Sequence, residues 1–234
     1  MLFRSANAAP TITGGGSQRT TNGYNLGLRR AYVQFDNLTV GQDWSTFQNV
    51  ATLPESTDYV GPTEGTVFVR QPLIRFSKKL GKNAVLHLSA ENAETQSAAP
   101  GLVENDQDRM PDFAARLNVT AGNAELALAG VTRQLRIDAG AAGGIRDTAF
   151  GWGVSGSGKI SFGPHKRHDI RFMATYGKGI GRYVGLNFSP DALIDSAGHL
   201  QTPKLFAGFA ALKIGLTPAV RTNLMISYQD VNYP

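Results

Sequence analysis

Six arginines lie within or next to stretches whose residues alternate between apolar and polar. They are Arg29, Arg30, Arg70, Arg75, Arg116 and Arg171. A guanidinium stays charged at physiological pH, and its planar set of donors fits a carboxylate or a phosphate. Because a charged side chain inside a strand is costly unless it is paired or faces water, these strands should have one wet face. Several arginines on that face would attract anions and repel cations.

Arg70 and Arg75 follow the long loop that comes after the first strands. They are therefore the best candidates among these arginines for binding anions. They are five residues apart, so strict alternation places them on opposite faces of a strand. A bulge at Pro72 would bring them to the same face, because proline cannot donate to a strand ladder. The alternative for any of the six is a structural ion pair with a nearby carboxylate such as Asp43.

The loop itself runs from about residue 43 to residue 65 and has neither helical nor strand periodicity. Loops of this length inside a compact domain are usually functional. Asp43, Trp44 and Glu55 belong to it and would shape a constriction if the loop folds against the wet face. For Trp44 the alternative is a place in the aromatic girdle at a membrane surface.

Composition limits the classes of protein that fit. Of the 234 residues 41% are hydrophobic and 18% are charged, and the formal net charge is +5. The absence of cysteine excludes disulfides, thiolate metal sites and a cysteine nucleophile. No run of apolar residues is long enough for a membrane helix. The positive charge is scattered without an aromatic–basic motif, so we expect no nucleic-acid partner, and no spacing of residues indicates a metal or another cofactor.

The order of strands and connections is the strongest feature of the chain. Strand-like stretches alternate regularly, and short turns near residues 37, 80, 122, 166 and 218 alternate with long loops. Strands of this kind, with short turns at one end and long loops at the other, are typical of a transmembrane β-barrel. We therefore predict an all-β fold, a transmembrane antiparallel β-barrel of which about ten strands are present. A soluble β-sandwich also alternates, but its connections need not sort by length.

The two ends of the chain predict a fragment. Residues 1–23 are rich in Ala, Gly, Ser and Thr and are expected to be a loop or a disordered start, followed by a partial barrel over residues 24–234. The first ten residues do not form the apolar region of a signal peptide. The final Asn232-Tyr233-Pro234 differs from the aromatic residue on which outer-membrane strands commonly finish. We expect the N-terminal part and some C-terminal strands to be missing.

Part of the sequence resembles the DcaP-like family of trimeric outer-membrane porins. The matching residues are Arg29-Arg30-Ala31-Tyr32, Gly41-Gln42-Asp43-Trp44-Ser45-Thr46-Phe47, Leu53-Pro54-Glu55, Gly61-Pro62, Arg70-Gln71-Pro72, Ile74-Arg75-Phe76 and Gly177-Lys178-Gly179-Ile180-Gly181-Arg182-Tyr183. The match covers about a third of the chain, and downstream the likeness is mostly of strand pattern. The resemblance implies a sixteen-stranded barrel, a homotrimer, and diffusion of small anionic solutes such as dicarboxylates through an arginine-lined pore.

These observations together predict a porin of the bacterial outer membrane that passes small anions passively, with no catalytic residues and no cofactor. Its partners would be further copies of itself, outer-membrane lipid and small anionic solutes. Two alternatives belong to other classes. An outer-membrane β-barrel enzyme of the lipase or protease type would need a Ser/His or Asp/His cluster at the barrel rim. A soluble β-sandwich binding module would be monomeric without detergent.

Overall fold

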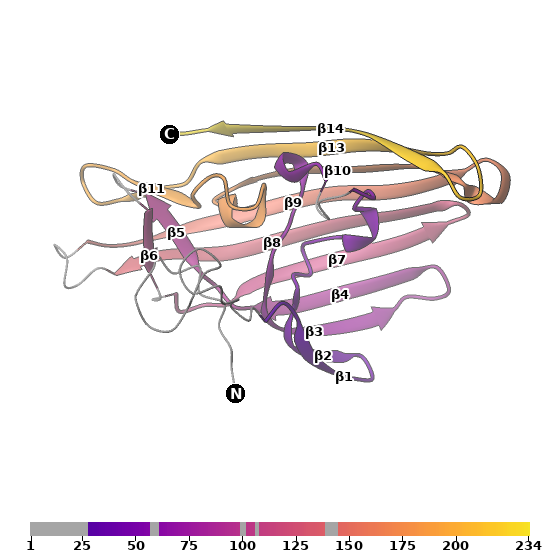
Figure 1. The fold of residues 1–234 in the computed structure, drawn as a ribbon. Helices are drawn as coiled ribbons and strands as arrows, with labels where there is room; N and C mark the ends of the chain where they lie inside the picture. The colour runs from indigo at the N-terminus through magenta and orange to yellow at the C-terminus, as the bar shows by residue number, and fades with distance from the viewer. Residues whose placement is uncertain (1–27, 57–60, 99–101, 106–107, 139–144) are drawn as a thin grey trace, which may run out of the picture.

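The computed structural model describes residues 28–56, 61–98, 102–105, 108–138 and 145–234. They contain a ten-stranded antiparallel sheet that curves around the segments connecting its strands (Figure 1). In spatial order its strands are β1 (Ala31–Phe35), β2 (Leu38–Trp44), β3 (Arg70–Lys79), β4 (Ala84–Glu91), β7 (Asp112–Ala121), β8 (Ala124–Asp138), β9 (Arg146–Phe162), β10 (His168–Lys178), β13 (Lys204–Gly215) and β14 (Arg221–Asn232). Each strand pairs with the next one along the chain within this sheet, as the alternation of short and long connections predicts.

The outer face of the sheet is apolar and exposed. Val33, Phe35, Ile74 and Ile226 are between 55% and 80% exposed, and each occupies an outward position in its strand. The opposite positions are polar or small, or they pack against the loops. A soluble β-sandwich would bury its large apolar side chains between two sheets. The arrangement seen here is the reverse, so the sandwich alternative is wrong.

All five short turns lie at one end of the sheet, on the right in Figure 1. The first is the two-residue connection Asp36–Asn37, in which Asp36 adopts a positive φ of 49°. The fourth contains a short 3-10 helix, η3 (Pro164–Lys166). We call this end of the sheet the turn end and the opposite one the loop end. Outer-membrane barrels place short turns on the periplasmic side and long loops outside the cell.

The long loops contain a second, smaller sheet that sequence reasoning missed. It has four short strands, in the order β12 (Leu200–Gln201), β11 (Ala192–Ile194), β5 (Thr95–Ala98) and β6 (Leu102–Asn105). The sequence predicted only long loops between the strands in these regions. The strands are only two to four residues long, and one pairing, β5 with β11, is parallel and joins distant parts of the chain. Such short segments carry no readable alternation.

The hydrophobic core lies on the concave side of the sheet, where loop residues pack against the strands. Its largest members are Phe47, Met173, Tyr183, Leu205 and Phe209. The core is therefore formed by loops that fold inward between the walls. Among the described residues, no helix has the length and hydropathy needed to span a membrane. The expected disordered start at residues 1–23 lies outside the described residues.

Candidate pore constriction

The described parts of the segment between β2 and β3, residues 45–56 and 61–69, are here called the inner loop and lie on the concave face between β2 and β14. The inner loop includes two 3-10 helices, η1 (Val50–Thr52) and η2 (Thr63–Gly65), and rejoins the sheet at Arg70. Near its start, Asn49 Nδ2 donates to Ser157 Oγ of β9 at 2.9 Å. Farther along, Ser227 Oγ of β14 donates to Glu64 at 2.8 Å. The loop thus contacts strands on both sides of the hollow.

The sequence placed the start of the returning strand a few residues too early. Residues 66–69 alternate like a strand but pair with the loop after β10 instead of with β2. Val67 forms a bridge with Val184, and the Phe68 amide donates to the Tyr183 carbonyl at 2.9 Å. The base of the inner loop is closed by the Ser45 amide, which donates to the Val69 carbonyl at 3.0 Å.

Small residues on β9 make room for the inner loop. Gly153 faces it directly, and a Cβ there would lie 3.0 Å from Ile180 and 3.2 Å from Phe47. The inward-facing Gly153 and Ser157 of β9 are therefore part of the surface against which the inner loop packs.

Three arginines on the inner face of the sheet bind the first half of the inner loop on the side of the loop that faces the sheet. Arg116 donates to the carbonyls of Thr46 (3.2 Å) and Gln48, and Arg171 donates to the carbonyl of Leu53. Arg221 pairs with the Glu55 carboxylate. Backbone carbonyls offer only partial negative charge, so the guanidinium groups of Arg116 and Arg171 position the loop without being neutralised by it.

Two of the carboxylates on this inner face are each shared by two cations. Asp43 lies 2.6 Å from both Arg30 and Arg75. Asp169 lies 2.7 Å from both Arg171 and Lys213. Each group keeps one unit of positive charge. We call Arg30, Arg75, Arg116, Arg171 and Lys213 the basic row.

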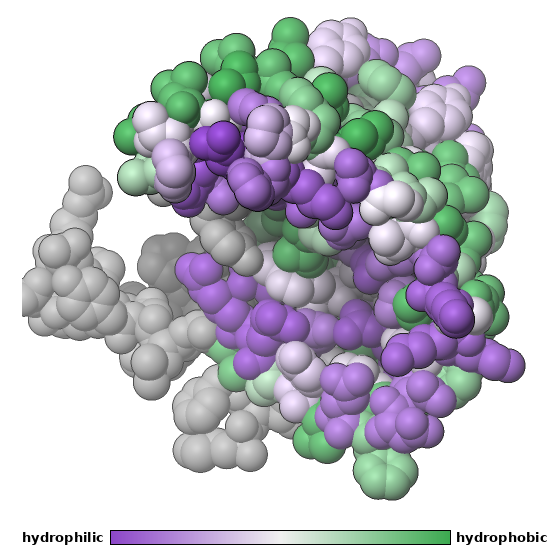
Figure 2. Space-filling model, turned by 90° about the vertical axis from the view of Figure 1, so that its right-hand side faces the viewer, coloured by the Kyte–Doolittle hydropathy of each residue, from purple (hydrophilic) through white to green (hydrophobic). Residues whose placement is uncertain are grey.

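The basic row still has a net positive charge when the neighbouring Glu91 is counted with it. The Glu91 carboxylate is buried and accepts from Gln71 Nε2 at 2.6 Å, Ser89 Oγ at 2.6 Å and the Thr46 amide at 2.7 Å. Those donors are neutral, and the cations of the row still outnumber the carboxylates. The side chains of Arg75, Arg171 and Lys213 are 13–17% exposed, so they still contact water. Figure 2, which looks into the turn end, shows a hollow bordered by hydrophilic side chains with hydrophobic ones around the outside.

The geometry of a curved sheet, an inward loop and a wet inner wall agrees with the comparisons with known proteins. The sequence matches the family described as the porin subfamily over residues 4–231. The chain belongs to the porin subfamily. No curated protein matches it. The outer membrane channel DcaP of Acinetobacter baumannii is similar in structure, with a TM-score of 0.78 and 20% sequence identity. The similarity covers 93% of this chain and 60% of that channel, so the chain spans less than two thirds of its structural relative.

Family membership and this structural likeness confirm the all-β porin fold and place this porin in the bacterial outer membrane. They also point to a channel instead of an enzyme. Among the described residues, no group of three His, Cys, Asp or Glu side chains is arranged to hold a metal ion.

The structure separates the two arginines that sequence reasoning paired. The register between β2 and β3 runs without interruption from Leu38–Phe76 to Trp44–Arg70, so the bulge predicted at Pro72 is absent. Pro72 lacks an amide proton, but its nitrogen is on the same side of the strand as its carbonyl, which accepts from the Asn92 amide just past the last β3–β4 pair, Leu73–Glu91, so the missing donor falls outside the strand pairing. Arg75 therefore faces inward.

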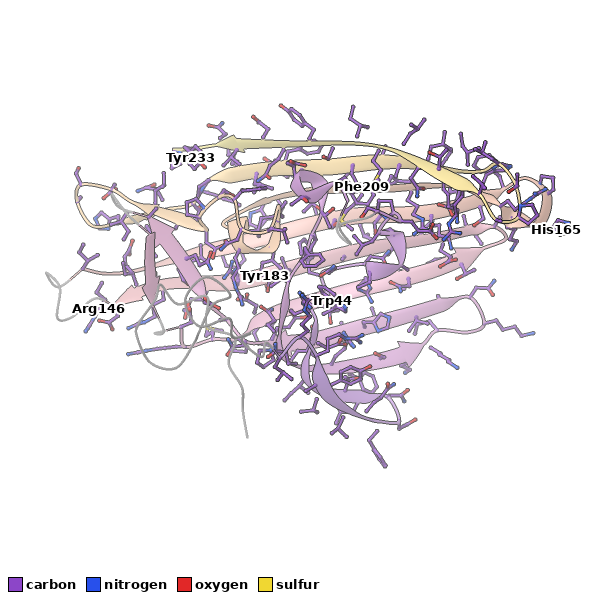
Figure 3. The ribbon with its side chains drawn as sticks, viewed as in Figure 1. Trp44, Arg146, His165, Tyr183, Phe209 and Tyr233 are labelled. Atoms are coloured by element: carbon purple, nitrogen blue, oxygen red, sulfur yellow. The ribbon has the colours of Figure 1, made fainter. Side chains whose placement is uncertain are left out.

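Arg70 and Trp44 lie together on the outer side of β3 and β2. The Arg70 guanidinium is 4.4 Å from the centre of the Trp44 ring, and Phe68 meets that ring edge-on at 4.8 Å. Trp44 is 7% exposed and packs beneath these two neighbours at the start of the inner loop (Figure 3). Of the loop residues named from the sequence, Asp43 and Glu55 hold cations of the inner wall. Arg29 is exposed and precedes β1.

A second, buried set of charges lies nearer the loop end. Arg133 of β8 contacts Asp112 at 3.3 Å and Asp191 at 2.7 Å, and all three side chains are fully buried. Arg182 joins them through Asp112 at 4.0 Å. We call these four residues, together with Tyr183, the closed cluster.

Tyr183 connects the closed cluster to the inner loop and lies near the middle of the concave side in Figure 3. Its hydroxyl donates to Asp112 at 2.7 Å and accepts from Gln71 Nε2 at 3.0 Å. Its ring meets Phe47 of the inner loop edge-on at 5.7 Å. Burial raises the pKa of Tyr183 well above its usual value, so the hydroxyl stays protonated and available as a donor.

Proposed function

We propose that this porin forms a water-filled channel that passes small anionic solutes, with dicarboxylates as the expected class. The observation that carries the proposal is the excess of cations over carboxylates in the basic row beneath the inner loop. A partly hydrated row of fixed positive charge raises the local concentration of anions and repels cations. The inner loop limits the size of solute that can pass.

The assembly that we propose is a homotrimer of closed sixteen-stranded barrels. The resemblance to DcaP-like porins supports this, and so does the share of the DcaP channel that the chain spans. The mass of the intact porin in detergent, measured by light scattering with the detergent subtracted, would be three times the chain mass. A monomer mass would contradict the assembly and leave the selectivity untouched.

The selectivity is tested by comparing two arginines in one strand. Arg75→Gln removes a charge from the inner face, whereas Arg70→Gln removes the same charge from the outer face. One unit charge about 8 Å from a permeating ion in water is worth roughly 0.5 kcal/mol. That charge lowers the free energy of an anion and raises the free energy of a cation by the same amount, so the anion-to-cation permeability ratio of the intact porin should fall about sixfold in Arg75→Gln and stay at the wild-type value in Arg70→Gln.

The reversal potential in planar bilayers gives this ratio. Equal effects of the two substitutions would contradict an inner-wall origin of the selectivity. An unchanged ratio in Arg75→Gln would contradict the proposed role of the basic row.

A further inference from the structure

A strained turn lies in the loop between β10 and β11, on the concave side of the sheet. Gly185, Leu186 and Asn187 have positive φ angles of 62°, 52° and 71°. Glycine adopts this left-handed conformation freely and asparagine tolerates it, but leucine rarely does. Backbone strain of this kind persists only where the surrounding structure holds the chain in place, and it is concentrated at functional positions. We call residues 185–188 the lumen tip.

The base of the lumen tip is closed by backbone contacts. Gly181 lies so close to the other side of the loop that an added Cβ would be 2.3 Å from the carbonyl oxygen of Ser189 and 2.4 Å from that of Pro190. Within the turn, the Asn187 amide donates to the Val184 carbonyl at 3.1 Å. A compact loop whose two ends meet is held by its own base. The lumen tip therefore keeps its shape without contacts at its exposed side chains.

The lumen tip contacts both the inner loop and the inner face of β14. The Gly185 amide donates to the Thr66 carbonyl of the inner loop at 3.1 Å. A Cβ on Gly185 would lie 2.5 Å from the amide oxygen of Gln229 on β14. Gln229 is two residues nearer the loop end than Ser227, which binds Glu64 of the inner loop. A solute that enters from the loop end therefore meets the lumen tip before it reaches the basic row.

Two apolar side chains of the lumen tip are exposed. Phe188 is 68% exposed and Leu186 is 44% exposed, whereas residues 179–185 and Ser189 are buried. Exposed apolar side chains on the outer face of the sheet contact lipid, but these two lie on the wet side. Neighbouring apolar groups that a rigid loop exposes to water are typical of a contact site for a ligand.

We propose that the lumen tip is an entry site for organic anions, where Phe188 and Leu186 contact the ring or hydrocarbon body of the solute. This inference rests on the proposed anion channel and names its solutes more closely, as carboxylates with an apolar body. The basic row attracts the carboxylates, and the lumen tip adds a contact that an inorganic anion cannot make. Six positions of β14, about 20 Å along the strand, separate Gln229 from Asn223, the cross-strand partner of Lys213. The apolar contact and the attraction to the row thus act in succession along the path.

The first test compares phthalate with maleate in the intact wild-type porin. Both solutes hold two carboxylates in cis on adjacent carbons, so at a pH at which both are dianions they differ mainly in the benzene ring of phthalate. The concentration of each that half-blocks the chloride current in planar bilayers measures its binding in the channel. Because a pair of aromatic rings contributes a factor of about five, phthalate should half-block at about one fifth of the maleate concentration. Equal half-blocking concentrations would overturn the proposal.

The second test locates the contact at the lumen tip. Phe188→Gln removes the ring, so phthalate and maleate should half-block at nearly equal concentrations, whereas Phe188→Tyr keeps the ring and should keep the wild-type ratio. The matched control Met225→Gln removes an exposed apolar side chain from the inner face of β14, nearer the turn end. It should keep the wild-type ratio too. A wild-type ratio in Phe188→Gln, or the same loss in Met225→Gln, would overturn the proposal.

Leu186→Asn separates a role in binding from a role in packing. Asparagine accepts the left-handed conformation, so the variant should melt at the wild-type temperature or above. The preference for phthalate should fall, because apolar contact area is lost. A lower melting temperature together with an unchanged preference would show that Leu186 packs against the barrel wall, and would overturn its role in the site.

The comparison of two solutes of equal charge also distinguishes this inference from the proposed channel function. Arg75→Gln should raise the half-blocking concentrations of phthalate and maleate by the same factor and leave their ratio unchanged. Failure of the anion channel would appear in the reversal potential of the wild type. Failure of the entry site would appear in the ratio of the two solutes.

Discussion

The basic row and the closed cluster each include arginines from the inner face of one sheet, yet they differ in charge balance and in exposure. In the basic row, Asp43 and Asp169 each serve two cations, and the side chains still contact water. In the closed cluster, Arg133 serves two carboxylates, and none of these three side chains is exposed. The first arrangement leaves charge available to a solute, and the second leaves none.

The difference shows what decides the role of an arginine in a porin wall. Arg133 is enclosed by the loop after β10, whose Tyr183 covers it with its ring 5.3 Å from the guanidinium. Arg116 and Arg171 lie below the inner loop and donate to its carbonyls while still facing the hollow. The position of the loop therefore decides whether an arginine of the inner face forms a structural ion pair or can line the pore.

The largest effect that would separate the two regions comes from Arg133→Met. The substitution keeps most of the volume but leaves Asp112 and Asp191 buried without their cation. Breaking a buried ion pair in this way costs about 3–5 kcal/mol. Arg221→Met, which removes the exposed partner of Glu55, should cost less than about 1 kcal/mol. Denaturant unfolding of the intact porin in lipid or detergent measures both free energies, and similar losses would remove the distinction between the closed cluster and an exposed pair.

Asp169→Asn should have a smaller effect than Arg133→Met. It should change the anion-to-cation permeability ratio in the opposite direction to Arg75→Gln. The asparagine keeps the shape and a hydrogen-bond acceptor for Arg171 but no longer offsets the charge of Arg171 and Lys213. By the same estimate of one unit charge in water, which acts with opposite sign on the anion and the cation, the anion-to-cation permeability ratio should rise about sixfold. An unchanged ratio, measured from the reversal potential, would show that the charge of the basic row does not reach the permeating ions.

The smallest effect concerns pH. The hydrogen bond from Arg221 holds the pKa of Glu55 below its usual value of 4.5. A lowered folded-state pKa means that the pair stabilises the inner loop above pH 4.5 and that this contribution is lost as pH falls through the folded-state value. Because the pair is exposed, the wild type should lose less than about 1 kcal/mol relative to Glu55→Gln between pH 7 and pH 3. An identical pH dependence in the two proteins would show that the pair contributes nothing.

Most of the fold was predictable because each wall strand repeats one simple rule. Apolar residues such as Val33 and Ile226 face lipid, and the alternation continues through whole strands, so the ten strands and their order could be predicted from the pattern alone. The small sheet of β5, β6, β11 and β12 could not. Its strands are too short for a period, and its pairing depends on where two long loops meet.

The residue types of the candidate site could be predicted from the sequence, but the side of the sheet on which each arginine lies was harder to predict. Arg75, Arg116 and Arg171 face the hollow, but Arg70 matches the same family pattern and faces outward. Strict alternation already separated Arg70 from Arg75, and Pro72 suggested a bulge that the uninterrupted register does not contain. Lys213 alternates with apolar residues of β13 and could have been found by parity. The burial of Arg133 depends on Asp191 and Tyr183, which lie in a distant loop, so no local pattern indicates it.

The most direct test of the central claim is the sign of the reversal potential of the intact wild-type porin in a planar bilayer under a potassium chloride gradient. Potassium and chloride diffuse almost equally in water, so the sign reports the fixed charge of the pore wall. An excess of cations in the basic row predicts a reversal potential of the sign expected when chloride permeates more readily than potassium. A potassium-selective sign, or no reversal potential beyond that of a neutral pore, would contradict the claim that the row faces the permeating solute.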